Sequence, residues 1–287
     1  MALVVSRGQV TGPRRLGLLP AEATSFVGRT AELAEIGALL GTVRMVTVVG
    51  PAGVGKTRLG VRAASLAAAQ FPDGVWLADL ASVSGPERLV PTITALLGLP
   101  AEDAEGDAAS CATLLGHLDD KRLLLILDTC EHLVDACASF ADTVLRAAPG
   151  VTLLATSRQP LDAQGEHAFP VPPLPTGDAA DLFAQRAAAV LPDFTITPRN
   201  NADVVRLCRR LDGLPLAIEL AAVRLRALPL AELVGQLESG IKMLTVSRRG
   251  TSPRQQTLSA AVEWSYQLCE PDERMLWERL SVFAGGF

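Results

Sequence analysis

The sequence predicts an α/β fold in which a parallel sheet is flanked by helices and followed by a helical domain. Short apolar runs alternate with stretches of helical periodicity over the first 170 residues or so, a pattern typical of a parallel sheet covered on both faces. Beyond residue 173 only helical patterns remain. With 287 residues, the chain is long enough for one large domain and a smaller one.

The expected elements follow from hydrophobic periodicity. A helix is predicted at Thr30–Leu40, where apolar residues recur at helical spacing. Strands are predicted at Met45–Val49, Val75–Leu80, Leu123–Leu127, Val151–Ala155 and Ala168–Val171. Later helices are predicted at about Asp178–Leu191, Asn201–Leu211, Leu214–Leu228, Leu230–Leu237, Leu258–Leu268 and Asp272–Leu280.

The proline-rich segment "VPPLP" at 171–175 marks a domain boundary, because it continues neither a helix nor a central strand. We expect a flexible lead-in at 1–24, an α/β domain at 25–172 and a helical domain at 173–247. The polar, basic stretch "SRRGTSPRQQ" at 247–256 then opens a final segment at 248–287, which ends in what looks like the start of another element.

Composition excludes several classes of protein. No apolar run approaches the roughly 18 residues of a membrane span, and the first residues do not resemble a signal peptide, so we expect a cytoplasmic protein. The net charge of -5 gives no general attraction to nucleic acid. Five scattered cysteines do not suggest a disulfide framework. Only three lysines occur, so a lysine in a special context stands out.

Lys56 has such a context. The segment Gly50-Pro-Ala-Gly-Val-Gly-Lys-Thr57 follows a strand, precedes a helix and matches the P-loop pattern G-x-x-x-x-G-K-[ST]. Its glycines let the backbone N–H groups point at phosphate oxygens. Lys56 would bridge the β- and γ-phosphates, and Thr57 would bind Mg²⁺. The expected nucleotide-binding residues here are Gly50, Ala52, Gly53, Val54, Gly55, Lys56, Thr57 and Arg58.

Two later strands end in polar residues that belong at the same sheet edge. Asp128 closes the apolar run "RLLLILD" and would hold Mg²⁺ beside the P-loop, although an acid also favours the position of a helix cap. In "ATSR" at 155–158, Thr156 or Ser157 would bind water or phosphate and Arg158 would reach the γ-phosphate. An exposed surface arginine is the alternative interpretation.

The stretch "LDTCEHLVDAC" at 127–137 suggests a metal site at first sight. Zinc needs four ligands, typically in closely spaced Cys or His pairs, and no second pair follows here. We interpret the stretch as a strand end and a helix start near Glu131, with Val134 and Cys137 on one apolar face. His132 is then a local hydrogen-bonding or surface residue.

With these motifs in this order, the chain resembles the signal-transducing ATPases with numerous domains (STAND), the class that contains the NB-ARC switches. "TSFVGRTAEL" at 24–33 is similar to the family's N-terminal motif, and "LDGLPLAIELAA" at 211–222 is similar to its GLPLA motif. Residues 254–287 resemble the opening of the family's winged-helix domain. The combination is similar to the bacterial branch in LuxR- and SARP-type transcriptional regulators.

The resemblance implies further site residues and a function. Val27 and Arg29 would lie near adenine and ribose, and Pro215 would lie against the base. Many hydrolysing relatives carry a second acid directly after the Mg²⁺ aspartate, where this chain has Thr129. Glu131 is the nearest substitute, so we expect slow turnover. The segment 248–287 would be a partial winged helix, without the later histidine motif that contacts ADP in the family.

The leading hypothesis is therefore an ATP- or ADP-binding switch module with slow Mg²⁺-dependent hydrolysis, which self-associates or assembles with homologous regulator chains. The alternative is a scaffold that binds nucleotide without hydrolysing it. A small-molecule kinase is a third hypothesis, but the helical region offers no evident acceptor site. We expect no sequence-specific DNA binding by this chain, because it is acidic and shows no recognition helix.

Overall fold

The computed structural model describes residues 17–99, 107–239, 266 and 270–280. Within them, six parallel strands form one sheet in the order β1-β3-β4-β5-β2-β6. The strands are β1 (Gly17–Leu18), β2 (Met45–Val49), β3 (Val75–Asp79), β4 (Leu124–Asp128), β5 (Thr152–Ser157) and β6 (Glu166–Pro170). The predicted α/β class with a parallel sheet is confirmed.

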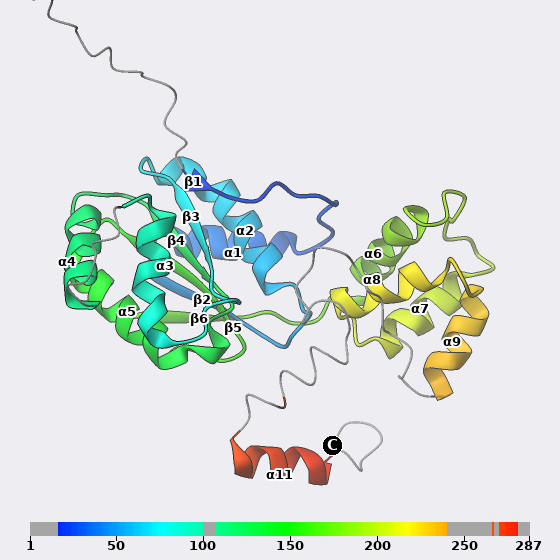
Figure 1. Ribbon diagram of the computed structural model, residues 1–287. Helices are drawn as coiled ribbons and strands as arrows, with labels where there is room; N and C mark the ends of the chain where they lie inside the picture. The colour runs from blue at the N-terminus through cyan, green and yellow to red at the C-terminus, as the bar shows by residue number, and fades with distance from the viewer. Residues whose placement is uncertain (1–16, 100–106, 240–265, 267–269, 281–287) are drawn as a thin grey trace, which may run out of the picture.

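Helices cover both faces of this sheet (Figure 1). α1 (Thr30–Leu40) and α2 (Lys56–Ala67) pack on one face, against Val46 and Val48 of β2. α3 (Leu89–Leu96), α4 (Asp107–Leu118) and α5 (Val134–Ala147) pack on the other face, which receives Met45. Short 3-10 turns lie at η1 (Ala68–Gln70), η2 (Pro86–Arg88) and η3 (Cys130–His132). Strand residues therefore alternate between two hydrophobic cores.

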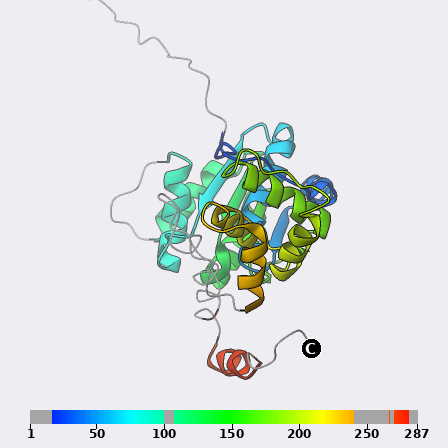
Figure 2. The same ribbon diagram turned by 90° about the vertical axis from the view of Figure 1, so that its right-hand side faces the viewer.

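A second group of helices has a core of its own. It contains α6 (Thr176–Ala188), α7 (Asn201–Arg210), α8 (Pro215–Arg224) and α9 (Leu230–Ser239). Phe183 is fully buried at its centre and meets Phe194 edge to face, with ring centroids 5.7 Å apart. Figures 1 and 2 show these helices gathered beside the sheet, next to the ends of its strands. A further helix, α11 (Pro271–Leu280), follows later in the chain.

Several predicted bounds shift by a few residues, among them those of β5, β6, α6 and α8, and two differences go further. The helix expected to start near Glu131 begins at Val134, because residues 130–132 form the 3-10 turn η3 instead. Residues 17 and 18, which we placed in the flexible lead-in, pair with β3 as an edge strand. Val134 and Cys137 do pack against one core, as expected from their spacing.

Several predictions concern residues outside the described ranges. These are most of the lead-in (1–16), the basic link at 247–256, nearly all of the helix at 258–268 and the final residues 281–287. The partial winged helix at 248–287 is therefore described only at residue 266 and through α11. None of the helices in the described ranges combines the length and apolarity needed to cross a membrane.

Candidate functional site

The loop between β2 and α2 has the backbone that its glycines predict. Gly53 and Gly55 have φ values of 79° and 97°, a region that residues with a Cβ rarely adopt. Gly50 is needed for space instead, since a Cβ there would lie 3.1 Å from the Val171 carbonyl oxygen. α2 begins at Lys56, so its unpaired N–H groups and positive dipole end face the loop.

Within this loop, Lys56 folds back onto the backbone. Its Nζ donates to the carbonyl oxygens of Gly50, at 2.8 Å, and Pro51, at 3.2 Å. Burial lowers the pKa of Lys56; Arg158 lowers it further, whereas Glu131 and Asp128 raise it. The ammonium is thus partly desolvated and bonded to neutral carbonyl oxygens. Charged phosphate oxygens are stronger hydrogen-bond acceptors than these carbonyls.

Asp128 lies at the same sheet edge, although β5 separates its strand β4 from β2. Its Oδ1 accepts hydrogen bonds from the Thr57 hydroxyl and the Thr156 hydroxyl, each at 2.6 Å. Asp128 is buried, and burial raises its carboxyl pKa while the two hydroxyl hydrogen bonds lower it. Asp128 is therefore bonded both to Thr57, the other predicted Mg²⁺ ligand, and to Thr156 of the intervening strand β5.

These groups fit a magnesium nucleotide. Carboxylate and hydroxyl oxygens are the ligands that Mg²⁺ takes, usually with one or two carboxylates and the rest from phosphate and water. Thr57 and Asp128 already face each other across a hydrogen bond, and the positive-φ loop beside them has the N–H groups that hold phosphates.

The structure pairs Glu131 with Arg158. Arg158 Nε donates to Glu131 Oε1 at 3.2 Å, and the two side chains are only 17% and 10% exposed. The other carboxylate oxygen, Oε2, is buried and has no hydrogen-bond partner among the described residues. Glu131, the predicted base, and Arg158, the predicted γ-phosphate contact, are thus neighbours. The Oε2 atom of Glu131 remains available to accept a further hydrogen bond.

Thr129 occupies the position where many relatives are expected to carry a second acid. Its φ of 67° and ψ of 56° lie in the left-handed region, which is unusual for a β-branched residue. Its N–H donates to the Thr156 hydroxyl at 3.0 Å, so the strained turn is tied to β5.

The remaining predicted nucleotide residues surround the loop. Arg29 is buried, and its guanidinium donates to the Val54 carbonyl at 3.3 Å and pairs with Glu32 at 2.9 Å. The Val54 side chain packs into the sheet core, so this residue presents only its backbone to a ligand, whereas Ala52 is half-buried at the turn of the loop.

The helical group reaches the loop through the GLPLA segment. Pro215 starts α8, and a Cβ on Gly55 would lie 3.9 Å from its ring. Leu216 N–H donates to the Gly53 carbonyl at 3.1 Å. Val27 packs against the core of the helical group, so it borders the same junction.

Arg58, predicted from the P-loop motif, points toward the segment before α1. Its guanidinium donates to the backbone carbonyls of Thr24, at 2.9 Å, and Ser25, at 3.1 Å. It also lies 5.9 Å from the Phe26 ring centroid and 3.5 Å from Glu219. The structure does not bring Arg58 together with Lys56 and Asp128.

Sequence reasoning missed Arg186 and Glu219. Arg186 is buried, donates to Glu219 at 2.9 Å and to the Ser25 carbonyl at 2.8 Å, and so joins α6, α8 and the segment before α1. A signal was present in the sequence: Arg186 follows Leu182 and Phe183 at helical spacing on the apolar face of its helix, where a charge needs a partner.

The cysteines and histidine of 127–137 serve the fold. Cys130 and Cys137 are fully buried, and the Cys130 thiol donates to the Leu127 carbonyl at 3.2 Å. His132 Nε2 lies 2.9 Å from the Val83 carbonyl oxygen. Across the described ranges, no group of three or more His, Cys, Asp or Glu residues is arranged to hold a metal ion.

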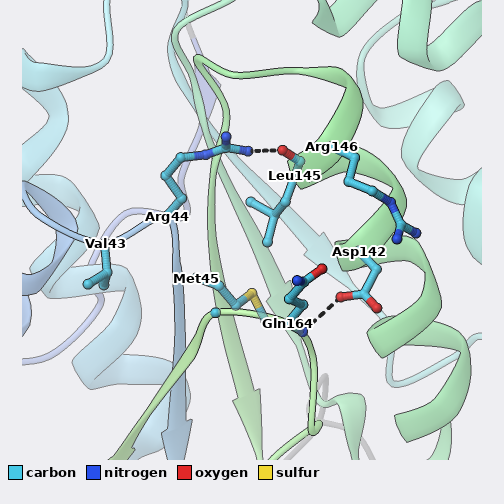
Figure 3. A pocket seen from close by; sticks show the side chains of 8 residues that line it. Val43, Arg44, Met45, Asp142, Leu145, Arg146 and Gln164 are labelled. Atoms are coloured by element: carbon cyan, nitrogen blue, oxygen red, sulfur yellow. Dashed lines mark hydrogen bonds between the residues drawn. The ribbon is translucent and has the colours of Figure 1, made fainter.

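A cavity of about 380 Å³ opens at the opposite end of the sheet, where β2 begins (Figure 3). It is lined by Val43, Arg44, Met45, Asp142, Leu145, Arg146, Gln164 and Gly165. Arg44 donates to three backbone carbonyls near the end of α5, and Asp142 accepts from the Gln164 N–H. Because these polar groups are occupied by the backbone, we assign no ligand to the cavity.

Known proteins resemble this chain in sequence and fold. The family described as "AAA domain" matches residues 40–158. The uncharacterized protein Rv0894 of Mycobacterium tuberculosis is 43% identical over 265 residues, which cover 92% of this chain and 67% of that protein. AfsR, a regulatory protein of Streptomyces griseus, is 30% identical over 93% of this chain. Rv0890c, named as an HTH-type transcriptional regulator of M. tuberculosis, is 42% identical over 87% of this chain.

Solved structures share the fold at low sequence identity. The Walker-type ATPase PABY2304 of Pyrococcus abyssi gives a TM-score of 0.52 at 13% identity, over 75% of this chain and 72% of that chain. Cdc6p from Pyrobaculum aerophilum gives 0.53 at 16% identity, over 70% and 62% of the two chains. The sequence relatives AfsR and Rv0890c are much longer proteins, and this chain spans only 27% and 28% of their respective lengths.

The fold and the site together define a P-loop NTPase module, in which a glycine loop, a lysine and a strand-end aspartate meet at one sheet edge. The chain belongs to the same family as Rv0894, and the regulatory protein AfsR is a further relative.

Proposed function

We propose that this chain is an ATP- and ADP-binding switch that hydrolyses ATP slowly in the presence of Mg²⁺. The observation that carries the proposal is the hydrogen bond of 2.6 Å between Thr57 and Asp128 beside the loop that holds Lys56. Lys56 and Thr57 begin α2 and Asp128 ends β4, and their meeting at one sheet edge supports a phosphate and magnesium site.

The chemistry assigns each group a task. The loop N–H groups and Lys56 would bind the phosphates, while Thr57 and Asp128 would hold the metal ion. Bound Mg²⁺ would neutralise charge on the β- and γ-phosphate oxygens. Glu131 accepts the proton of the attacking water through Oε2; the water oxygen bonds to the γ-phosphorus, and the bond to the bridging oxygen breaks to give ADP and phosphate.

Two features support slow turnover. Thr129 has no carboxylate at the position after Asp128, and Glu131 is engaged by Arg158. This shielded pair must open before Glu131 is free to act as a base, and opening it costs energy. Binding is therefore proposed to be the main property of the site, with hydrolysis as a slow reset.

The switch role is supported by contacts between the loop and the helical group. Leu216 N–H donates to the Gly53 carbonyl at 3.1 Å, so the backbone that would bind phosphate also bonds the start of α8. We propose that nucleotide state is passed to the helices by this route, and from there to a second copy or a homologous regulator chain.

Replacing Lys56 tests nucleotide binding directly. We expect Lys56→Ala to weaken ATP and ADP binding by about 10- to 100-fold, because a charge-assisted contact to phosphate is lost. Calorimetric titration with each nucleotide and Mg²⁺ measures this. Lys121→Ala is the matched control, since it removes a lysine that pairs with the exposed Asp120. Absence of ATP and ADP binding by the wild type would rule the proposal out.

The second candidate is a nucleotide-binding scaffold that does not hydrolyse ATP. The same Glu131–Arg158 pair favours it, because it occupies the only carboxylate that we assign as base. Phosphate release over hours separates the two candidates: release that disappears in Asp128→Ala excludes the scaffold.

We propose that this chain does not by itself bind DNA in a sequence-specific way. The name of Rv0890c refers to a helix-turn-helix, and this chain spans 28% of that relative. A sequence-selective gel shift with the purified chain, sensitive to salt, would contradict this proposal.

A further inference from the structure

The pair formed by Glu131 and Arg158 joins two elements that end at the same edge of the sheet. Glu131 belongs to the turn η3 after β4, and Arg158 follows the last residue of β5. Their side chains are 10% and 17% exposed, so the hydrogen bond of 3.2 Å is shielded from solvent. A shielded pair of this kind is costly to break unless another partner replaces the one that leaves.

We propose that the γ-phosphate of ATP displaces Glu131 from Arg158, so that the base is released only when a third phosphate is present. This inference rests on the proposed nucleotide-binding function and concerns the regulation of the same site. Arg158 thus has two alternative anionic partners, the Glu131 carboxylate and the terminal phosphate.

The properties of the two side chains suit such an exchange. Arginine carries five N–H donors and no acceptor, and its planar group binds carboxylate and phosphate alike. Glu131 and Arg158 both act electrostatically on Lys56, which the P-loop pattern assigns to the β- and γ-phosphates, so all three charges surround one place. A γ-phosphate there lies within the field of Arg158 and repels Glu131.

The second carboxylate oxygen shows what Glu131 does once it is released. Oε2 is buried without a hydrogen-bond partner among the described residues, although a buried carboxylate oxygen normally has one. A water molecule beside the γ-phosphate supplies that missing donor. The exchange therefore leaves Glu131 free to align with this water.

ADP has no γ-phosphate, so it leaves the pair in place. The pair then acts as a detector of the third phosphate. The ion pair between Glu131 and Arg158 breaks when ATP binds and stays intact when ADP binds. Removing the Glu131 charge is expected to favour ATP selectively, because a neutral amide then replaces the carboxylate that competes with the γ-phosphate for Arg158.

Binding measurements on the full chain test the exchange without relying on turnover. The β,γ-imido analogue of ATP and ADP are titrated with Mg²⁺ into wild type, Glu131→Gln, Arg158→Gln and the double variant. Glu131→Gln is expected to bind the ATP analogue about 3- to 10-fold more tightly with ADP affinity unchanged. Arg158→Gln is expected to bind the analogue more weakly, again with ADP unchanged.

The double variant decides between exchange and simple charge repulsion. If Glu131 acts through Arg158, Glu131→Gln has little effect on analogue affinity in the Arg158→Gln background. The proposal would be overturned if Glu131→Gln raised the analogue affinity equally in the wild-type and Arg158→Gln backgrounds. An equal rise in ADP affinity would overturn it as well. If Arg158→Gln does not fold, Arg158→Lys replaces it and is expected to show a reduced gain.

Asp203→Asn is the matched control, since it breaks an exposed ion pair with Arg206 on α7. It is expected to leave the affinities for both nucleotides unchanged. Wild-type protein that binds neither the analogue nor ADP would refute the proposed function itself. Wild-type protein that binds both, with Glu131→Gln without effect, would refute only the exchange.

Discussion

At the scale of single residues, the Thr156 hydroxyl makes two hydrogen bonds that hold the site together. It donates to Asp128 at 2.6 Å and accepts from the Thr129 N–H at 3.0 Å. The side chain is 1% exposed. One buried hydroxyl thus positions the predicted Mg²⁺ ligand and holds the left-handed turn that follows it.

Thr156→Val is expected to lower the free energy of unfolding by about 1–3 kcal/mol, because it leaves the Thr129 N–H and one Asp128 interaction without their buried partner. Denaturant unfolding monitored by circular dichroism measures the change. Thr152→Val, at the buried amino end of the same strand, is the matched control and is expected to change stability by less. Equal losses in the two variants would contradict the role given to the Thr156 hydroxyl.

At the scale of elements, the loop and the start of α8 are in direct contact. A Cβ on Gly53 would lie 2.9 Å from Leu216 Cβ, and the φ of Gly53 is 79°. Both facts require glycine, the first because of the neighbouring helix and the second because of the loop's own backbone.

Gly53→Ala is therefore expected to lower the free energy of unfolding by about 1–2 kcal/mol from the backbone conformation alone, with a further loss from the Leu216 contact. The same substitution should weaken the docking of α8, which faster hydrogen exchange of the Leu216 amide would report. Gly177→Ala is the control, since a Cβ there meets nothing within 4 Å in a helical position. A Gly53→Ala protein as stable as this control would refute the argument.

The sequence predicted the elements of the sheet well, because buried strands and amphipathic helices leave local patterns. β2, for example, has the bounds that its apolar run predicted, Met45–Val49. The position of β5 between β2 and β4 was not predicted from the sequence, since strand order depends on contacts between distant segments. The link from Thr156 to Asp128 and the pair of Arg158 with Glu131 could not be read from the sequence for the same reason.

At the scale of the whole molecule, Arg186 connects parts of the chain that are about 160 residues apart. It donates to the Ser25 carbonyl at 2.8 Å and hydroxyl at 3.1 Å, and to Glu219 at 2.9 Å. Glu219 in turn lies 3.5 Å from Arg58 on α2. The helical group and the sheet are therefore joined through a charged network as well as through the loop.

Arg186→Gln is expected to lower the free energy of unfolding by about 2–4 kcal/mol, because it leaves Glu219 and the Ser25 carbonyl short of a buried partner. It should also expose the junction to limited proteolysis, since the segment at 24–25 then keeps its bonds to Arg58 but loses those to Arg186. Arg206→Gln, which breaks an exposed pair with Asp203, is expected to cost less than about 1 kcal/mol. Indistinguishable digestion patterns for the two variants would show that Arg186 does not hold the junction.

The left-handed backbone at Thr129 has a consequence for how this site can evolve. Asparagine and aspartate adopt a φ near 67° more readily than threonine, whose branched Cβ is crowded there. A mutation that introduced aspartate at this position would relieve strain in the turn and place a carboxylate directly after Asp128. In evolutionary terms, the backbone at this position favours the gain of a second acid and does not oppose it.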